Sequence, residues 1–397
     1  MVEQRSGTGN YPFAADLYAW DQQRGVAVSL VHGPAQGFCT RPSTSKIPDN
    51  LLRETHSMRI HYLAIVLAVI CAPSSAHHSI AANFDAATTI EMEGEITSIA
   101  WRNPHILFTM AATDGSGAEW ELETHSLSIM RRLDAPEPFV ETGDHVKVSG
   151  WPSHRGQGMF VNNMLLPDGE EFVFRFQAEP SDLVWSDRMW GTTDNWFAES
   201  GDASAADRGI FRVWSTTLAG GAFFFWLPEY PLTPEAQAKM DAFDPAADDP
   251  LLNCALKGMP GIMSAPYPME FHDRGDIIDL QIEEYDSLRR IYMNPETAPE
   301  PTPSIFGYSV GHWEGETLVV ETTHLNWGHV GGRGILVSDQ LKLVERFTAT
   351  ENGGRLEYSM TMTDPATFTE PVYMDKSWVY LPDVRVEPYE CKLRDEL

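Results

Sequence analysis

The stretch "DQLKLVERFTA", residues 339–349, alternates apolar and polar side chains with the two-residue period of a β-strand. One face of this strand carries Leu341, Leu343, Glu345 and Phe347. Because three of these four side chains are apolar, we expect the face to be buried and Glu345 to lie within it. The stretch therefore predicts a strand of a β-sheet whose inner face holds one carboxylate.

Seven further stretches on either side of this strand have the same β-character, and short turns separate most of them. They are "MEFHDR" (269–274), "DIIDLQIEEY" (276–285), "LRRIYM" (288–293), "FGYSVGHW" (306–313), "ETLVVETTHL" (316–325), "RLEYSMTMT" (355–363) and "KSWVYL" (376–381). Consecutive strands with tight turns predict an up-and-down meander, and eight strands can close around one small ligand. We therefore expect a lipocalin-like barrel domain over residues 261–397.

A second carboxylate, Glu284, is also expected on the inner face of this barrel, because it shares strand parity with Ile278, Leu280 and Ile282. An ionised carboxylate on an apolar face is costly unless it is paired. The basic partners available nearby are Arg289, Arg290 and His324. Two interpretations stay open: ion pairs that stabilise the barrel, or a site that binds a ligand or acts as acid and base. The residues of such a site would be Glu284, His312, His324 and Glu345.

The motif "GYSVG", residues 307–311, matches the G-x-S-x-G pattern of a nucleophilic serine. That pattern requires a strand, a turn and a helix, whereas another β-stretch follows here. We expect no histidine within reach of Ser309. The two outer glycines are better interpreted as bend positions of a barrel strand.

The segment between residues 88 and 166 predicts a second, smaller barrel. Its β-stretches are "TTIEMEGEITSIAW" (88–101), "HILFTMAAT" (105–113), "AEWELETHSL" (118–127), "DHVKVSGWP" (144–152) and "GMFVNNMLL" (158–166). Five such strands, with a helical turn at "LSIMRRL" (127–133), predict an OB-like β domain over residues 77–179. Residues 180–260 are expected to be a Trp-rich connector with one helix, "LTPEAQAKMDAF" (232–243), capped by Thr233.

Residues 58–76 have the features of a secretory signal peptide. The basic start Met58-Arg59 precedes an apolar run that is too short to cross a bilayer, and small residues end at Ala76. Cleavage after Ala76 would make His77 the new N-terminus and would remove the apolar segment. We therefore expect no stable membrane insertion of the processed chain. We expect a periplasmic or secreted protein. Residues 1–57 are expected to be a spurious extension of the gene or a disordered segment.

The new N-terminus predicts a copper site. A terminal histidine offers its amine and its imidazole to one metal ion, and Cu(II) prefers such a square-planar nitrogen set. His78 adds another donor, and His105 in "NPH" supplies a further imidazole. The alternative is that His77 and His78 form a solvated terminus and that His105 only ends a strand.

The net charge of the chain limits the macromolecules that it is expected to bind. The net charge of −29 at pH 7 disfavours binding to nucleic acid and to anionic membranes. The oligomeric state is left open.

Of the four cysteines, only Cys254 and Cys391 remain after the expected cleavage, which predicts one disulfide. Two separate buried thiols are the alternative.

Two resemblances to families support this layout. The motifs "AHHS", "WRNPH" and "PDG" resemble an uncharacterised family of bacterial exported domains. The stretches "CALKGMPGIMSAPYPMEF", "RRIYM" and "GYSVGHWEGETLVVETT" resemble a second uncharacterised family, common in proteobacteria and acidobacteria. That family's usual Pro-His-Ser is replaced here by Leu336-Val337-Ser338, so this histidine is absent. The resemblances imply the domain layout and carry no reaction.

The sequence as a whole predicts an exported binding protein. Its C-terminal barrel would hold a small apolar ligand, and its processed N-terminus would hold copper. The alternative is a periplasmic enzyme of undefined reaction that uses the glutamates and histidines inside the barrel.

Overall fold

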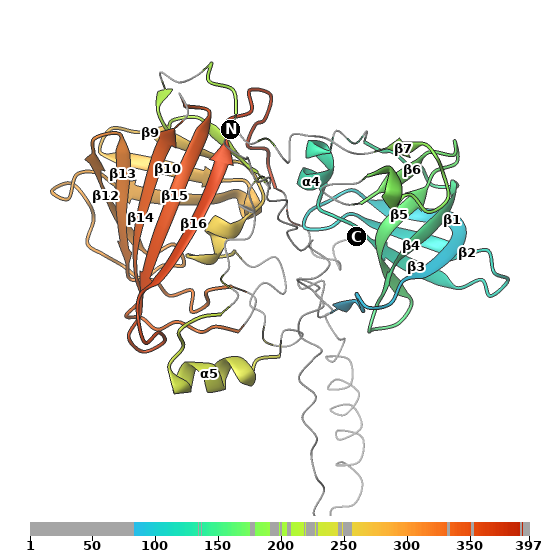
Figure 1. Cartoon of the computed structure of the whole chain (residues 1–397), viewed down its shortest axis with the longest axis horizontal. Coiled ribbons are helices and arrows are strands. Elements are labelled where there is room, and N and C mark those ends of the chain that lie inside the picture. Colours follow the sequence, from blue (N-terminus) through green and yellow to red (C-terminus); the bar gives the residue numbers. More distant parts are fainter. Residues whose placement is uncertain are drawn as a thin grey trace, which may run out of the picture. The chain divides into compact units, whose positions relative to one another are not determined.

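A computed structural model of the chain shows a mainly β protein with two closed barrels (Figure 1). The structure describes residues 83–391 except 134, 136, 175–178, 191–197, 199–200, 205–207, 218, 220–226, 228, 245–247, 249–255, 332–333, 351–352 and 390. Among these residues, neither α-helix has the length and apolar character needed to cross a membrane. The prediction of a mainly β fold with an N-terminal and a C-terminal barrel is confirmed.

The N-terminal barrel contains the five strands and the helical turn that the sequence predicts. These are β1 (Ile90–Ala100), β2 (Leu107–Ala112), β3 (Glu119–Glu123), α4 (Leu127–Arg132), β4 (His145–Pro152) and β5 (Gly158–Leu165). The hydroxyl of Ser126 caps α4 by accepting a hydrogen bond from the Ile129 amide. Two short strands, β6 (Glu171–Val173) and β7 (Met189–Trp190), extend the sheet beyond β5.

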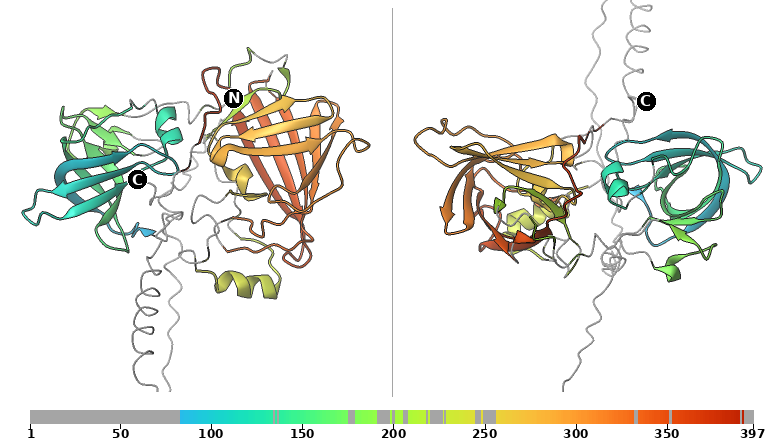
Figure 2. Two further views of the ribbon diagram at one scale, coloured as in Figure 1. Left: turned by 180° about the vertical axis from the view of Figure 1, so that it is seen from behind. Right: turned by 90° about the horizontal axis from the view of Figure 1, so that it is seen from above.

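The order of the five barrel strands is β3-β2-β1-β4-β5, and a parallel pairing of β3 with β5 closes the ring. All the other pairs in this ring are antiparallel. A ring with an odd number of strands cannot alternate in direction throughout, so one parallel pair is a geometric necessity. The strands curl into a closed ring when seen from above (Figure 2).

The C-terminal barrel contains nine strands, including all eight that the sequence predicts. They are β8 (Val213–Thr216), β9 (Met269–Asp273), β10 (Ile277–Ile282), β11 (Ser287–Tyr292), β12 (Tyr308–Glu314), β13 (Thr317–Thr323), β14 (Lys342–Thr350), β15 (Arg355–Thr363) and β16 (Val372–Val379). The ninth strand, β8, comes from the segment expected to be a connector, and it lies between β16 and β9. It joins the two ends of the predicted meander.

The C-terminal barrel also differs from a pure up-and-down meander at one place. Strands β11 and β12 run parallel and share only two residue pairs, Ile291 with Ser309 and Tyr292 with Val310. The proline-rich segment 293–307 returns the chain to the end of the barrel where β11 began. As in the smaller barrel, an odd number of strands requires one parallel pair.

Side chains from all sides fill the interior of the C-terminal barrel. Buried apolar residues include Trp214, Phe271, Leu280, Phe347 and Trp378. The predicted parity of β14 is confirmed, because Leu343, Glu345 and Phe347 are all at most 1% exposed.

Helix α5 (Pro234–Asp241) lies at one end of the C-terminal barrel, below the strands in Figure 1, and begins where the sequence predicts. Its N-cap Thr233 accepts a hydrogen bond from the Ala236 amide, and Pro234 follows at the first helical position. This helix forms one wall of the pocket described below.

Candidate functional site

The inner face of the C-terminal barrel holds a buried ion pair between Arg289 of β11 and Glu345 of β14. The guanidinium donates to both carboxylate oxygens, with 2.9 Å from Nη1 to Oε1. Arg289 also donates to the hydroxyls of Ser309 (3.1 Å) and Thr322 (2.7 Å), and Tyr358 donates to Glu345 (2.8 Å). Five neighbouring strands thus contribute one side chain each to a closed hydrogen-bond network.

The electrostatics of this network favour a fixed charge pair. Burial disfavours the charged form of Arg289, but the adjacent Glu345 carboxylate outweighs this effect and raises the pKa of Arg289. Burial and the same carboxylate raise the pKa of Tyr358 well above its ordinary value, so Tyr358 remains a donor. The polar groups of this network already bind one another, which favours a structural role for the pair over a role in ligand binding. The same contacts account for Ser309. Its hydroxyl accepts a hydrogen bond from Arg289, shares another with Thr322, and contacts no histidine among the described residues.

Glu284 is buried as predicted, but its partner is different from those expected. It lies in a 3₁₀ turn after the end of β10, and its Oε1 is 2.6 Å from Nζ of Lys257. Nearby, the Nζ atom of Lys376 donates to the carbonyls of Met263 (3.0 Å) and Ala265 (2.9 Å). Burial lowers the pKa of Lys376 to about 7, although the negative charge of Glu284 acts in the opposite direction.

The two predicted site histidines of the barrel do not join these carboxylates. His312 lies on the outer face, 53% exposed, with Nε2 3.3 Å from Glu314. His324 was expected on the inner face, and this expectation is wrong: it is exposed. Strand β13 ends at Thr323, and His324 has a φ of 56°, so strand parity no longer applies to it. Glu284, His312, His324 and Glu345 therefore do not form one site.

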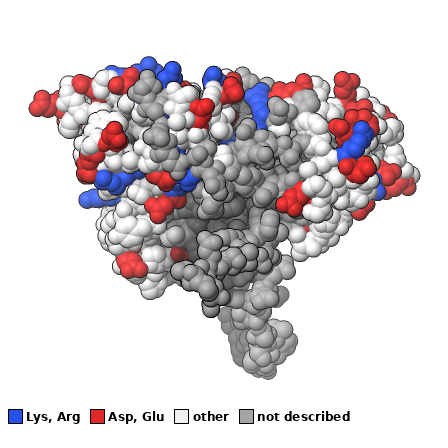
Figure 3. Space-filling model, turned by 45° about the horizontal axis from the view of Figure 1, so that its top comes forward, with Lys and Arg blue, Asp and Glu red and all other residues white. Residues whose placement is uncertain are grey.

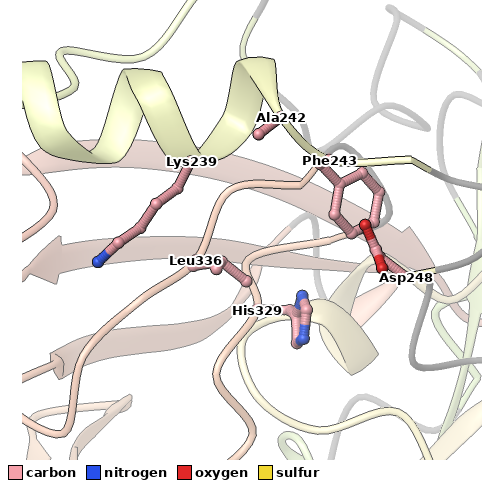
Figure 4. A pocket seen from close by; sticks show the side chains of 6 residues that line it. All are labelled: Lys239, Ala242, Phe243, Asp248, His329 and Leu336. Carbon is pink, nitrogen blue, oxygen red and sulfur yellow. The ribbon is translucent and has the colours of Figure 1, made fainter. Parts of the chain in front are cut away.

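A pocket of about 450 Å³ lies between α5 and the described residues of the 327–337 loop, which exclude 332 and 333 (Figure 4). Its lining residues are Lys239, Ala242, Phe243, Asp248, His329 and Leu336. Lys239, Ala242 and Phe243 are spaced i, i+3 and i+4, so they share one side of the helix and the turn that follows it. The sequence prediction of a helix was correct here, whereas the pocket was not foreseen.

The opposite wall of the pocket is a small hairpin inside the 327–337 loop. His329 and Leu336 form an isolated antiparallel bridge, and the amide of Val330 donates to the carbonyl of Ile335. Gly334 has a φ of +78°, and a Cβ atom there would lie 2.4 Å from Cγ of Phe243. Glycine at this position lets the Phe243 ring rest directly on the hairpin.

Both walls of the pocket are anchored to one buried turn after β15. On the helix side, the amide of Thr233 donates to the carbonyl of Thr367 (2.9 Å). On the loop side, the hydroxyl of Thr367 donates to the carbonyl of Leu336 (3.0 Å), and the Ser338 hydroxyl donates to Asp364 (2.7 Å). Asp364 is 1% exposed and also accepts from Thr367. Both walls of the pocket are therefore hydrogen-bonded to the same turn.

In the N-terminal barrel, His105 is held in a defined orientation. Its Nδ1 lies 2.9 Å from the carbonyl of Thr124 and 3.4 Å from Oε1 of Glu123. A carbonyl only accepts, so Nδ1 carries the proton and Nε2 carries the lone pair. Burial lowers the pKa of His105, and burial raises the pKa of Glu123 to about 8.

The other predicted ligands and one of the predicted cysteines lie outside the described residues. His77 and His78 belong to this group, and so does Cys254. Within the part of the chain that the structure describes, no group of three or more metal-ligating side chains comes together. Cys391 is disulfide-bonded, and its pairing with Cys254 stays a prediction.

Sequence reasoning missed Lys257, Lys376 and the pocket residues. Lys376 begins the predicted strand 376–381 and shares strand parity with the apolar residue Trp378, which was a usable signal of its burial. Lys257 and the pocket wall at 327–337 are in irregular segments, which carry no periodic signal.

One comparison with known proteins gives a match. A model of a family of unknown function, DUF6152, matches residues 65–161. The matched segment contains His77, His78 and His105 and runs from before β1 into β5, which is less than half of the chain. No curated protein matches this chain.

Proposed function

We propose that this chain is an exported binding protein whose small ligand occupies the pocket between α5 and the 327–337 loop. The observation that carries the proposal is the pocket itself, which has a volume of about 450 Å³. Small-molecule sites are typically concave, between about 300 and 1,000 Å³, mostly apolar and lined by a few polar groups. Ala242, Phe243 and Leu336 supply apolar walls here, and His329 supplies a polar group.

This proposal moves the apolar ligand away from the centre of the barrel. The Arg289–Glu345 pair and the aromatic side chains around it already fill that space. The pocket beside α5, by contrast, is open, and hydrogen bonds join both of its walls to one buried turn.

The test uses the neutral fluorescent probe N-phenyl-1-naphthylamine. We expect the protein to bind it, and we expect Phe243→Ala to weaken binding at least about tenfold, because the variant removes an aromatic wall. The matched control is Tyr373→Ala, which removes an aromatic side chain that is 66% exposed. Equal probe binding in Phe243→Ala and the control would contradict the proposal.

A second function, copper binding, is supported by the orientation of His105. Metal-ligating histidines commonly donate their other ring N–H to a carbonyl or a carboxylate. The Nδ1 contacts with Thr124 and Glu123 have this form and leave Nε2 as the metal-binding atom. The proposed site adds the amine and ring of His77, with His78 as a further donor.

We also infer the finer features of the layout. Export rests on the signal-peptide pattern of residues 58–76. The order β1-β2-β3-β5-β4, with α4 between β3 and β4, supports an OB-type N-terminal barrel. The C-terminal family assignment rests on the motif around "GYSVGHWEGETLVVETT".

A further inference from the structure

We propose that the ligand of the α5 pocket is a small organic amine whose ammonium group pairs with Asp248 while its apolar body lies against Phe243 and Leu336. This inference rests on the proposed binding function and names the chemical class of the ligand. It follows from a difference between the two charged side chains of the pocket. Lys239 is in an ion pair, whereas Asp248 is in no ion pair with a described residue.

The positive charge of the pocket is already paired. Nζ of Lys239 lies 2.9 Å from Oε1 of Glu235, one helical turn earlier. Its side chain extends along one side of the pocket and its ammonium group points away from His329 (Figure 4). Lys239 therefore contributes its methylene groups to the wall, and the adjacent Glu235 carboxylate reduces the attraction that its ammonium group exerts on an anion.

The negative charge of the pocket is not paired in this way. Asp248 accepts a hydrogen bond from the amide of Asp244 (3.0 Å), and it forms no ion pair with any other described residue. Its carboxylate lies at the end of the pocket where Phe243 lies, away from Lys239 (Figure 4). A carboxylate next to an aromatic ring is a suitable environment for an ammonium group, because the face of the ring also attracts cations.

The charges around the pocket also favour a positively charged ligand. The segment 232–248 contains four acidic residues and one lysine, and the whole chain has a net charge of −29. On the face of the molecule drawn in Figure 3, acidic side chains are widely spread, and groups of Lys and Arg lie among them. This field raises the local concentration of cations and lowers that of anions, and the effect weakens with added salt.

The apolar part of the pocket sets the size of the ligand body. The rings of Phe243 and His329 meet edge to face with centroids 6.5 Å apart, and Leu336 lies opposite His329 across the hairpin bridge. An aromatic ring or a short aliphatic chain would contact these side chains. The ligand class is therefore a small organic amine with one apolar group.

The experiment compares three probes of similar shape by isothermal titration calorimetry at pH 7.5 in low salt. The probes are the cation 2-phenylethylamine, the neutral 2-phenylethanol and the anion 3-phenylpropionate. We expect the amine to bind at least about tenfold more tightly than the alcohol, and the anion most weakly. Raising the salt concentration should weaken amine binding and leave alcohol binding unchanged.

Two variants assign the charge effect to one carboxylate. Asp248→Asn should weaken amine binding about tenfold and leave alcohol binding unchanged. The matched control, Asp241→Asn, changes an exposed acid of α5 that does not line the pocket and should preserve both affinities. Thermal unfolding checks that both variants remain folded.

The outcomes separate this inference from the proposed function. Equal binding of amine and alcohol, tighter binding of the anion, or an unchanged amine affinity in Asp248→Asn would overturn the amine assignment, while the pocket would remain a binding site. Failure of all three probes and of N-phenyl-1-naphthylamine to bind would overturn both.

Discussion

Arg289 and Glu345 form a charge pair in the interior of a nine-stranded barrel, where both side chains are at most 1% exposed. Hydroxyl groups from three further strands form hydrogen bonds with this pair, so the network links the five strands from β11 to β15. Because transfer of charges into a protein interior is costly, the two partners are stable there only together.

The first prediction concerns the loss of one partner. Glu345→Gln should lower the free energy of unfolding by about 3–5 kcal/mol, since it leaves the Arg289 guanidinium buried without its counter-charge. Urea unfolding measures this change. Probe binding in the pocket beside α5 should persist under native conditions, because Glu345 does not line it.

Two variants serve as controls for this effect. Glu357→Gln removes an exposed carboxylate of β15 that pairs with Arg355, and it should cost at most about 1 kcal/mol. Replacing both partners, Arg289→Met with Glu345→Leu, should recover much of the lost stability. A stable Glu345→Gln protein that no longer binds the probe would show that Glu345 is a site residue instead.

The second prediction concerns Lys376, whose folded-state pKa burial lowers from 10.5 to about 7. Between these two pH values the unfolded chain holds a proton that the folded chain has lost. The free energy of unfolding should therefore rise with pH across this window, by at most about 1.4 kcal/mol per pH unit from this group. Below pH 7 both states are protonated and the destabilising effect is complete.

The measurement compares urea unfolding of the wild type and Lys376→Met between pH 7.5 and 9.5. The wild type should gain stability relative to the variant as the pH rises. Lys342→Met, at an exposed position of β14, is the control and should show a constant difference. A constant difference in Lys376→Met as well would mean that this lysine keeps its proton in the folded protein.

The fold could be predicted from the sequence wherever alternation was regular. The alternation around Glu345 predicted the strand, its buried face and the need for a basic partner. Arg289 is that partner. Pairing between distant strands was not predictable in this way. The four residues of β8 are too few to show alternation, and nothing local indicates that β11 and β12 pair in parallel.

The candidate site was harder to predict, because its parts are far apart in the chain. The pocket combines residues near 239–248 with His329 and Leu336, and two threonines of other segments align its walls. The prediction for His324 was wrong because the rule of alternation ends where the strand ends. Side chains in turns need their backbone angles, which no periodic pattern supplies.

The third prediction is that Cys391 pairs with Cys254. Cys391 is disulfide-bonded, and these are the two cysteines that remain after the expected cleavage. Peptide mapping without reduction should find the two linked, and reduction should destabilise the protein by about 4–5 kcal/mol in the chain-entropy model. Two alkylatable thiols in the exported protein would contradict the pairing.

The fourth prediction is that the processed chain, beginning at His77, binds one Cu(II) ion. A form with an extra N-terminal methionine should bind it at least about tenfold more weakly, because the terminal amine and the His77 ring no longer belong to one residue. Titration followed by electron paramagnetic resonance measures both affinities and the nitrogen ligands.

The imidazole of His105 can be tested in the same titration. His105→Ala should lower the copper affinity and remove one nitrogen from the spectrum, since its Nε2 is the atom left for a metal. His145→Ala, which changes an exposed histidine of β4, should alter neither. Equal affinity in the processed and extended forms would rule out the amine as a ligand. An unchanged spectrum in His105→Ala would confine any copper to the terminal histidines, because the barrel would then contribute no nitrogen.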